Sequence, residues 1–238
     1  MKAPGMKTLG ILGGMSWESS AVYYRLINQA VAARRGGLHS APLLLASLDF
    51  ETVAAHQRAD DWTGAAALLG RTATGLRGAG AQALLIATNT MHKVGDEVAA
   101  ASGLPLLHIA DATAAALRAA GVRRAAFLGT RFSMEDRGIV IDQLERHGAP
   151  ILVPEADDRA LMHRVIFEEL CRGIVRDDTR AGIAALIARQ AARGADAVVL
   201  GCTEIGLLID ARSSPLPCFD TTVLHAAAAV DWMLEDTP

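Results

Sequence analysis

Two segments of this chain, one in each half, have nearly the same sequence, and this internal repeat constrains the fold more than any other feature. Three motifs recur in the same order at nearly equal spacing. The first is an apolar run followed by glycine, the second is an apolar run followed by polar residues, and the third is a run that contains proline. In the first half they are LGILGG at 9–14, GAQALLIATNT at 80–90 and LPLLHIADAT at 104–113; in the second half they are AAFLGT at 125–130, GADAVVLGCTE at 194–204 and SPLPCFDTT at 214–222. The repeat indicates two copies of one α/β unit, although strand-then-glycine patterns recur in any βαβ chain.

Short apolar runs alternate with longer helical patterns along the whole chain, which predicts βαβ units around parallel sheets. The expected strands are 8–12, 42–47, 83–87, 106–108, 124–128, 151–153 and 197–200. The expected helices are 19–34, 62–79, 111–120, 134–147, 158–170, 179–193 and 222–234, and segment 51–60 is expected to be an irregular loop over a site. The predicted fold class is therefore α/β, with a first lobe at 6–115 and a second at 116–207. We expect residues 208–238 to pack back on the first lobe, with completion of the second lobe as the alternative.

Composition excludes several classes of protein. A net charge of -3 with interspersed signs provides no basic stripe, so no nucleic-acid partner is expected. Three cysteines form no disulfide framework, and no His, Glu or Asp spacing suggests a metal site. Without a signal sequence or a long apolar stretch, no membrane association is expected and a cytoplasmic location is predicted.

Cys202 and Thr88 occupy matching positions of the repeat, each just after a predicted buried strand. Ligands bind beyond the carboxyl ends of open parallel sheets, so a pseudo-twofold relation between the halves predicts that both residues face one cleft. A thiol at a helix N-terminus is favoured as the thiolate, which makes Cys202 a candidate nucleophile or base; the alternative is a small buried hydrophobic residue. Cys171 and Cys218 are interpreted as packing residues.

Two other groups of polar residues are candidates for binding. Thr88, Asn89 and Thr90 offer hydroxyl and amide groups suited to a carboxylate, although Thr and Asn are also common helix caps. The Gly-Gly turn before Met15 and Ser16 is expected to present backbone N–H groups to a small anion. In the second half, the segment beginning at Gly129 and Thr130 stands in the equivalent place.

The ordered motifs LGILGGMSWES, ATNTMHK, LHIADAT, LGTRFSME, PEADDRA, IFEEL and GCTEIGLL resemble the aspartate/glutamate racemase superfamily, and most closely its broad-specificity amino-acid racemase subgroup. The resemblance spans about residues 8–225. It implies two pseudo-symmetric flavodoxin-like αβα lobes with an active-site cleft between them, usually in a homodimer. It also implies racemisation of an amino acid without pyridoxal phosphate (PLP), metal or another cofactor.

The same resemblance implies roles for individual residues. Cys202 matches one of two catalytic cysteines that flank the substrate Cα, and Thr88 stands where the archetype has the other. Further expected roles are binding of the α-carboxylate by Asn89, Thr90 and Thr203, lining of the cleft by Met15, Ser16 and Thr130, binding of the α-ammonium by Glu204, and contact with the substrate side chain by Gln57 and Arg58. No basic residue matches those that aspartate racemases use for the distal carboxylate, so strict aspartate specificity is not expected.

Replacement of one cysteine by threonine has a chemical consequence. A thiol with an unperturbed pKa near 8.5 is readily tuned, whereas an alcohol is scarcely ionised near neutrality, so catalysis is expected to be asymmetric. The missing thiol also leaves two alternatives open. One is a single-cysteine decarboxylase or cis-trans isomerase of the same superfamily, and the other is a non-catalytic protein that binds an amino acid or carboxylate.

Overall fold

The computed structural model describes residues 5–235 of the chain, which divide into two compact α/β units. Unit 1 comprises the described residues up to His108 and from His225 on, and unit 2 comprises Ile109–Leu224. The expected boundaries at residues 115 and 207 therefore differ from those of the structure. Residues 109–115 begin a helix whose apolar side chains join the core of unit 2, and residues 208–224 include a strand of its sheet. Residues 236–238 of the expected returning segment lie outside the described residues.

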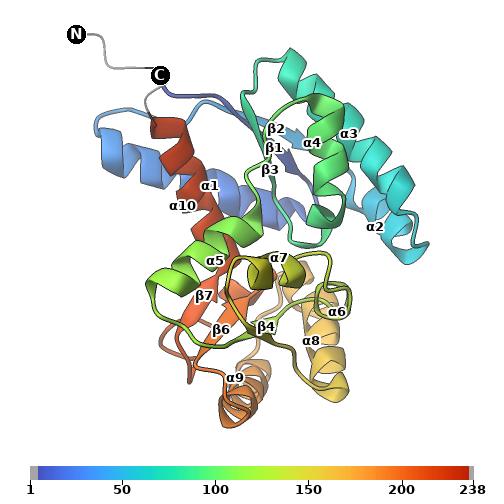
Figure 1. Cartoon of the computed structure of the whole chain (residues 1–238), viewed down its shortest axis with the longest axis vertical. Coiled ribbons are helices and arrows are strands. Elements are labelled where there is room, and N and C mark those ends of the chain that lie inside the picture. The colour runs from blue at the N-terminus through green and yellow to red at the C-terminus, as the bar shows by residue number, and fades with distance from the viewer. Residues whose placement is uncertain (1–4, 236–238) are drawn as a thin grey trace. The chain divides into compact units, whose positions relative to one another are not determined.

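Unit 1 is built around a three-stranded parallel sheet with strand order β2-β1-β3. Its elements are β1 (Leu9–Gly13), α1 (Trp17–Arg35), β2 (Leu43–Ser47), α2 (Phe50–Arg58), α3 (Trp62–Gly78), β3 (Ala83–Ile86), the 3₁₀ helix η1 (Thr90–Val94), α4 (Gly95–Ser102) and most of α10 (Thr221–Leu234). α1 and α10 cover one side of the sheet, and α3 and α4 cover the other (Figure 1). β1 and β3 are buried along their whole length because helices cover both faces, as is typical of parallel strands.

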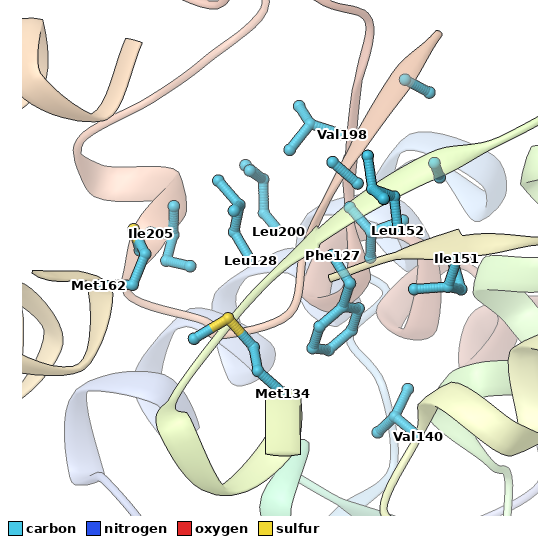
Figure 2. Packing of buried hydrophobic residues seen from close by; sticks show 14 of the residues in the cluster. Phe127, Leu128, Met134, Val140, Ile151, Leu152, Met162, Val198, Leu200 and Ile205 are labelled. Carbon is cyan, nitrogen blue, oxygen red and sulfur yellow. The ribbon is translucent and has the colours of Figure 1, made fainter. Parts of the chain in front are cut away.

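Unit 2 has a four-stranded parallel sheet with strand order β5-β4-β6-β7. Its elements are α5 (Ile109–Ala119), β4 (Ala125–Leu128), α6 (Arg131–Glu135), α7 (Ile141–Arg146), β5 (Ile151–Leu152), α8 (Ala156–Glu168), the 3₁₀ helix η2 (Leu170–Arg172), α9 (Asp177–Ala192), β6 (Ala197–Leu200), the 3₁₀ helix η3 (Ile205–Leu207) and β7 (Cys218–Asp220). One apolar core joins the strands to the helices, and Figure 2 shows Phe127, Leu128 and Leu200 within it.

The two sheets repeat one topology. In each sheet, the first strand along the chain lies in the middle, between the second strand and the third. β1 pairs with β3 in the same way that β4 pairs with β6, with Leu12 opposite Ile86 and Leu128 opposite Leu200. The α/β class with two parallel sheets is therefore confirmed.

Three expected elements were wrong. Segment 51–60 was expected to be irregular but forms α2, whose buried residues Val53 and Gln57 lie one turn apart. The continuous helix expected over 134–147 is instead two short helices, α6 and α7, separated by a turn in which Gly138 donates its backbone N–H to Asp136 Oδ1. Residues 106–108 form a single bridge between Leu106 and Leu84 rather than a strand.

Candidate active site

Three polar residues of unit 2, two of them candidates from the sequence, lie at one edge of its sheet. Thr130 follows β4, Cys202 follows β6, and Asp220 ends β7. Because these strands are parallel neighbours, their carboxyl ends meet at the same edge. The turn after β6 is also held closely, since the Gly201 N–H donates to the Leu128 carbonyl over 2.6 Å.

Cys202 is half-buried, and its thiol has a short contact with a carboxylate. Its Sγ donates a hydrogen bond to Glu204 Oε2 over 2.9 Å. The Thr203 hydroxyl donates to the same oxygen over 2.6 Å, and both Thr203 and Glu204 are buried. The structure thus brings these three candidate residues together around one carboxylate oxygen.

The expected stabilisation of the Cys202 thiolate is wrong for the protein without substrate. Burial, followed by the charge of Glu204 and the neighbouring Cys171, raises the pKa of Cys202 well above its ordinary value. The chain after Glu204 forms only the three-residue helix η3, so there is no long helix dipole to oppose these effects. The proton therefore resides on sulfur in the resting protein.

Cys171 belongs to the same cluster, although we had interpreted it from the sequence as a packing residue. Burial, followed by the charge of Glu204 and a hydrogen bond with it, raises the pKa of Cys171 to about 12. Cys171 lies in η2, far from Cys202 in sequence, and only the packing of η2 beside the end of β6 brings the two thiols near one carboxylate. No local sequence pattern signals this proximity.

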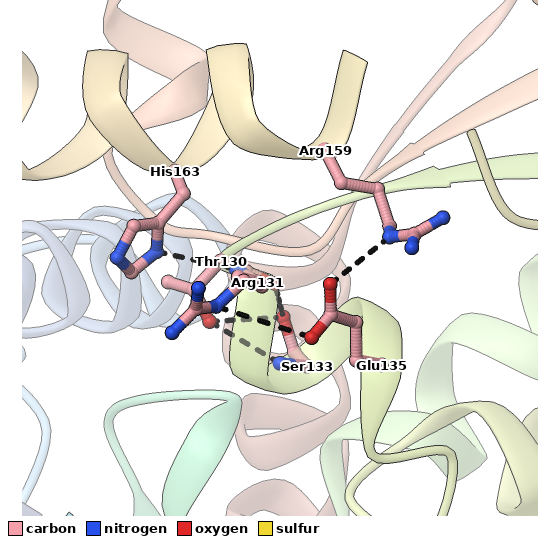
Figure 3. A network of polar contacts seen from close by, with 6 residues as sticks. All are labelled: Thr130, Arg131, Ser133, Glu135, Arg159 and His163. Atoms are coloured by element: carbon pink, nitrogen blue, oxygen red, sulfur yellow. Dashed lines mark hydrogen bonds and ion pairs between the residues drawn. The ribbon is translucent and has the colours of Figure 1, made fainter. Parts of the chain in front are cut away.

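Thr130 begins α6 within a polar network that fixes the turn after β4 (Figure 3). Its Oγ1 accepts the Ser133 backbone N–H, and the two hydroxyl groups lie 3.2 Å apart. The next backbone N–H, of Arg131, donates to Nδ1 of His163 on α8 over 3.3 Å. Thr130 is buried, and its contacts with Ser133 fix its position at the sheet edge.

In unit 1, Met15 and Ser16 follow the end of β1. Gly14 has a φ of +86°, and a Cβ there would lie 2.1 Å from the Leu48 carbonyl oxygen, so the turn requires glycine. Ser16 is the N-cap of α1, and its Oγ accepts the Ser19 backbone N–H over 3.2 Å. Met15 and Ser16 are both buried.

The segment from Thr88 to Thr90 occupies the same edge of the unit 1 sheet, after β3. Thr88 is half-buried, whereas Asn89 and Thr90 are buried. His92 Nδ1 donates to the Thr88 carbonyl over 2.9 Å, which holds the turn between β3 and η1. Burial, followed by the charges of His108 and His225, lowers the pKa of His92 well below its ordinary value.

Gln57 and Arg58, the two residues expected to contact the substrate side chain, lie in different surroundings. Gln57 is buried on α2, and its Nε2 donates to the Met91 Sδ over 3.1 Å, next to the end of β3. Arg58 is exposed and forms an ion pair with Glu51 at the surface of the same helix. Gln57 is therefore near the strand ends, and Arg58 is not brought to the other candidates of unit 1.

Within residues 5–235, no three His, Cys, Asp or Glu side chains are grouped as a metal ion would require. No helix in that range is both long enough and apolar enough to cross a bilayer.

Comparison with known proteins gives a consistent assignment. Residues 12–229 match the family model described as Asp/Glu/hydantoin racemase. A candidate Asp/Glu racemase from Yersinia pestis has 46% identity and a TM-score of 0.90, covering 97% of this chain and 100% of that one. An aspartate racemase homologue from Pyrococcus horikoshii has 29% identity and a TM-score of 0.83 with the same coverage. The maleate isomerase of Pseudomonas putida S16 shares only the fold, with 14% identity, a TM-score of 0.57 and coverage of 95% of this chain and 92% of that one. The chain therefore belongs to the Asp/Glu/hydantoin racemase family.

Proposed function

We propose that this protein is a PLP-independent amino-acid racemase that transfers protons at the substrate Cα, with Cys202 and Thr88 as its two catalytic residues. The observation that carries the proposal is the equivalence of their positions. Thr88 is the second residue after β3 and Cys202 the second after β6, and these two strands occupy the same place in the repeated topology. A racemase needs one proton donor or acceptor on each face of a planar intermediate.

The chemistry assigned to each residue follows from its side chain. As a thiolate, Cys202 removes the α-proton from one enantiomer; as a thiol, it returns a proton to the same face. Thr88, directly or through water, serves the opposite face. Negative charge develops on the substrate carboxylate as the Cα–H bond breaks, so hydrogen-bond donors near both strand ends lower the barrier.

The remaining candidates are assigned to binding. Asn89, Thr90 and Thr203 are proposed to hold the α-carboxylate, and Met15, Ser16 and Thr130 to line the site. Gln57 is a better candidate than Arg58 for contact with the side chain, because it is the one near the strand ends. Glu204 is a candidate for the α-ammonium or for the thiol itself, and its contacts favour the thiol.

The test is incubation of the protein with single L- and D-amino acids in deuterated water. Racemisation with deuterium at Cα supports the proposal. The replacement of one thiol by Thr88 also favours a second candidate, a one-cysteine decarboxylase or cis-trans isomerase, which is recognised by CO₂ release or alkene isomerisation. Ligand-induced thermal stabilisation without amino-acid exchange, CO₂ release or alkene isomerisation indicates a binding protein and contradicts both. Sedimentation of the purified protein tests the homodimer that we also propose.

A further inference from the structure

Three histidines of unit 1 pack together next to the turn that carries Thr88. The ring centre of His92 lies 4.6 Å from that of His108 and 5.7 Å from that of His225. His92 also donates from Nδ1 to the Thr88 carbonyl over 2.9 Å, so the cluster is attached to this turn. His92 and His225 are buried, whereas His108 is half-buried. His108 is therefore the imidazole of this cluster that solvent reaches.

Backbone pairing places His108 at the same sheet edge as Thr88. Leu84 and Leu106 form a parallel bridge. His108, two residues further along, therefore reaches the level of Ile86, and Thr88 follows Ile86 by only two residues. Side chains alternate across a strand, and Leu106 packs on the side of the sheet that α3 and α4 cover. The same alternation puts His108 on that side, where η1 also packs.

The two buried rings have fixed hydrogen bonds. His92 Nδ1 carries a hydrogen because it faces the carbonyl oxygen of Thr88. His225 Nε2 carries one for the same reason, since it lies 2.7 Å from the Leu107 carbonyl oxygen. Burial, followed by the charges of His108 and His225, lowers the pKa of His92 and keeps it neutral. His108, in contrast, is accessible enough to exchange its proton with water.

Thr88 needs a partner to complete a proton transfer. If its hydroxyl gave a proton to Cα alone, the oxygen would remain as an alkoxide, which is strongly disfavoured near neutral pH. If it took a proton from Cα, its own proton would have to leave at the same time. A hydroxyl therefore takes part in such chemistry together with an adjacent acid or base. Imidazole suits this role because it gains and loses a proton near neutral pH.

We propose that His108 exchanges protons with the Thr88 hydroxyl during the reaction, directly or through one water. This role rests on the racemase function proposed above. In one direction, an N–H bond of the His108 imidazolium breaks, its electron pair stays on nitrogen, and the proton binds Thr88 Oγ1. The O–H bond of Thr88 breaks in the same step, and its proton joins the electron pair on Cα. In the other direction, Thr88 Oγ1 takes the α-proton while its own proton binds neutral His108. Between cycles, His108 exchanges its proton with solvent.

This role serves only one face of the substrate, which a purely structural role would not do. Without His108, Cys202 still removes the α-hydrogen that faces it. Slow inversion prolongs the intermediate, so the thiol has time to exchange with deuterated water and to return deuterium to the same face. That enantiomer should therefore keep exchanging its α-hydrogen although inversion is slow. The other enantiomer, whose α-hydrogen faces Thr88, should lose exchange and inversion together.

The experiment compares the wild type with His108→Gln in deuterated water. The substrates are the pure L- and D-forms of the amino acid that the wild type racemises fastest. NMR follows deuterium at Cα, and chiral chromatography follows inversion. We expect inversion to fall about 10²- to 10⁴-fold, the range of general acid–base catalysis. For the enantiomer that faces Cys202, exchange should fall much less, so its ratio of exchange to inversion should rise by about tenfold or more.

Two further variants serve as references. Thr88→Val removes the hydroxyl and keeps the shape of the side chain, so only the enantiomer that faces Cys202 should still exchange. His108→Gln must single out the same enantiomer. His39→Gln is the matched control, because His39 is an exposed histidine between α1 and β2 of the same unit. It should change neither exchange nor inversion.

Two outcomes in His108→Gln would overturn the proposal: inversion that stays within about twofold of the wild type, well short of an acid–base loss, or exchange that falls by the same factor for both enantiomers. Partial unfolding lowers every rate by one factor and leaves the ratio of exchange to inversion unchanged, so that ratio decides. Should the glutamine variant not fold, His108→Asn is measured with the same expectation. A wild type that neither exchanges nor inverts any amino acid ends the proposed function itself, whereas an active wild type with unchanged ratios in His108→Gln ends only the role of His108.

Discussion

The Cys202 thiol donates a hydrogen bond to the Glu204 carboxylate over 2.9 Å, two residues along the same turn after β6. Burial, followed by the negative charge of Glu204, raises the pKa of this thiol and favours its protonated form. A reactive cysteine is often expected in electropositive surroundings. Here burial and a neighbouring carboxylate disfavour the thiolate instead.

Replacement of Cys202 by serine should abolish racemisation. Serine is nearly the same size but its hydroxyl is scarcely ionised near neutrality, so the group that exchanges the α-proton is lost. We expect kcat to fall by about 10³-fold or more, within the range for loss of a general acid or base. Polarimetry or chiral chromatography measures the rate.

Cys218→Ser is the matched control for this substitution. Cys218 lies in β7, where its Sγ donates long hydrogen bonds to the carbonyl oxygens of Leu216 and Asp210, at 3.7 and 3.8 Å. We expect its kcat to stay within about twofold of the wild type, as for a residue outside the acid–base machinery. Equal losses in both variants would show that the effect of Cys202→Ser is structural.

The asymmetry between Thr88 and Cys202 should appear in turnover numbers. Because the two enantiomers interconvert with equal energies, kcat/KM must be the same in both directions, but kcat and KM can differ separately. The enantiomer whose α-hydrogen faces Cys202 should have the higher kcat, since a thiol is a better acid and base than an alcohol. Initial rates at saturation from each pure enantiomer test this.

Thr88→Cys is the variant that probes the same asymmetry from the other side. It supplies a second thiol at the equivalent strand end and should bring the two kcat values closer together. Equal kcat values in the wild type would contradict the asymmetric assignment. A ratio that does not change in Thr88→Cys would show that residue 88 takes no part in proton transfer.

The sequence predicted the sheets well because burial on both faces leaves a strong signal. β1, β3, β4 and β6 are continuous apolar runs, and each was expected within one residue of its observed bounds. Repetition of the pattern also placed Thr88 and Cys202 at equivalent strand ends. These inferences use only local periodicity and spacing, which a single sequence contains.

Elements held mainly by partners distant in sequence were harder to predict. α2 buries only Val53 and Gln57, so its apolar periodicity is too weak to distinguish it from a loop. α4 was not expected at all, because the polar segment before it hides the start of the helix. Ion pairs of Arg137 with Asp142 and Glu145 stabilise the break between α6 and α7. No local sequence pattern predicts these ion pairs.

Alignment of the two halves by spacing also set the wrong residues against each other. Alignment of the runs LPLLHIADAT and SPLPCFDTT by their single aspartates sets Asp111 against Asp220. The strand pairing instead places Leu106 beside Leu84 as it places Cys218 beside Val198. His108, two residues after Leu106, is therefore the counterpart of Asp220. The protonation state of Cys202 was also hard to predict, because its pKa depends first on burial and then on the charges of Glu204 and Cys171.

His92 should make the protein less stable in mild acid. The folded state holds its pKa well below 6.5, first through burial and then through the charges of His108 and His225. A group with a lowered pKa stabilises the fold above its unfolded pKa, and this contribution declines as pH falls below 6.5 because the unfolded chain binds the proton more readily. The loss is up to about 1.4 kcal/mol for each pH unit below 6.5.

Urea unfolding at about pH 7.5 and pH 5.5 measures this effect in the wild type and in His92→Gln. The wild type should lose up to about 1.4 kcal/mol more than the variant across this interval. The variant serves as its own reference, because only the difference between the two pH values is compared. The same pH dependence in both proteins would show that His92 is not the group responsible.

Gly201→Ala should destabilise the turn that carries Cys202. A Cβ at position 201 would lie 2.1 Å from Phe127 Cζ, and Phe127 is fully buried in the core of unit 2 (Figure 2). The added methyl group would overpack this core, so we expect a loss of about 1–3 kcal/mol or more in the free energy of unfolding.

Gly182→Ala is the control. Gly182 lies inside α9 with no atom within 4 Å of the added Cβ, so this variant should gain about 0.5–1 kcal/mol from higher helix propensity. Urea denaturation of the two variants should therefore shift in opposite directions. A Gly201→Ala protein as stable as the wild type would mean that Phe127 and the turn can separate, and that the position of Cys202 is less constrained than its contacts indicate.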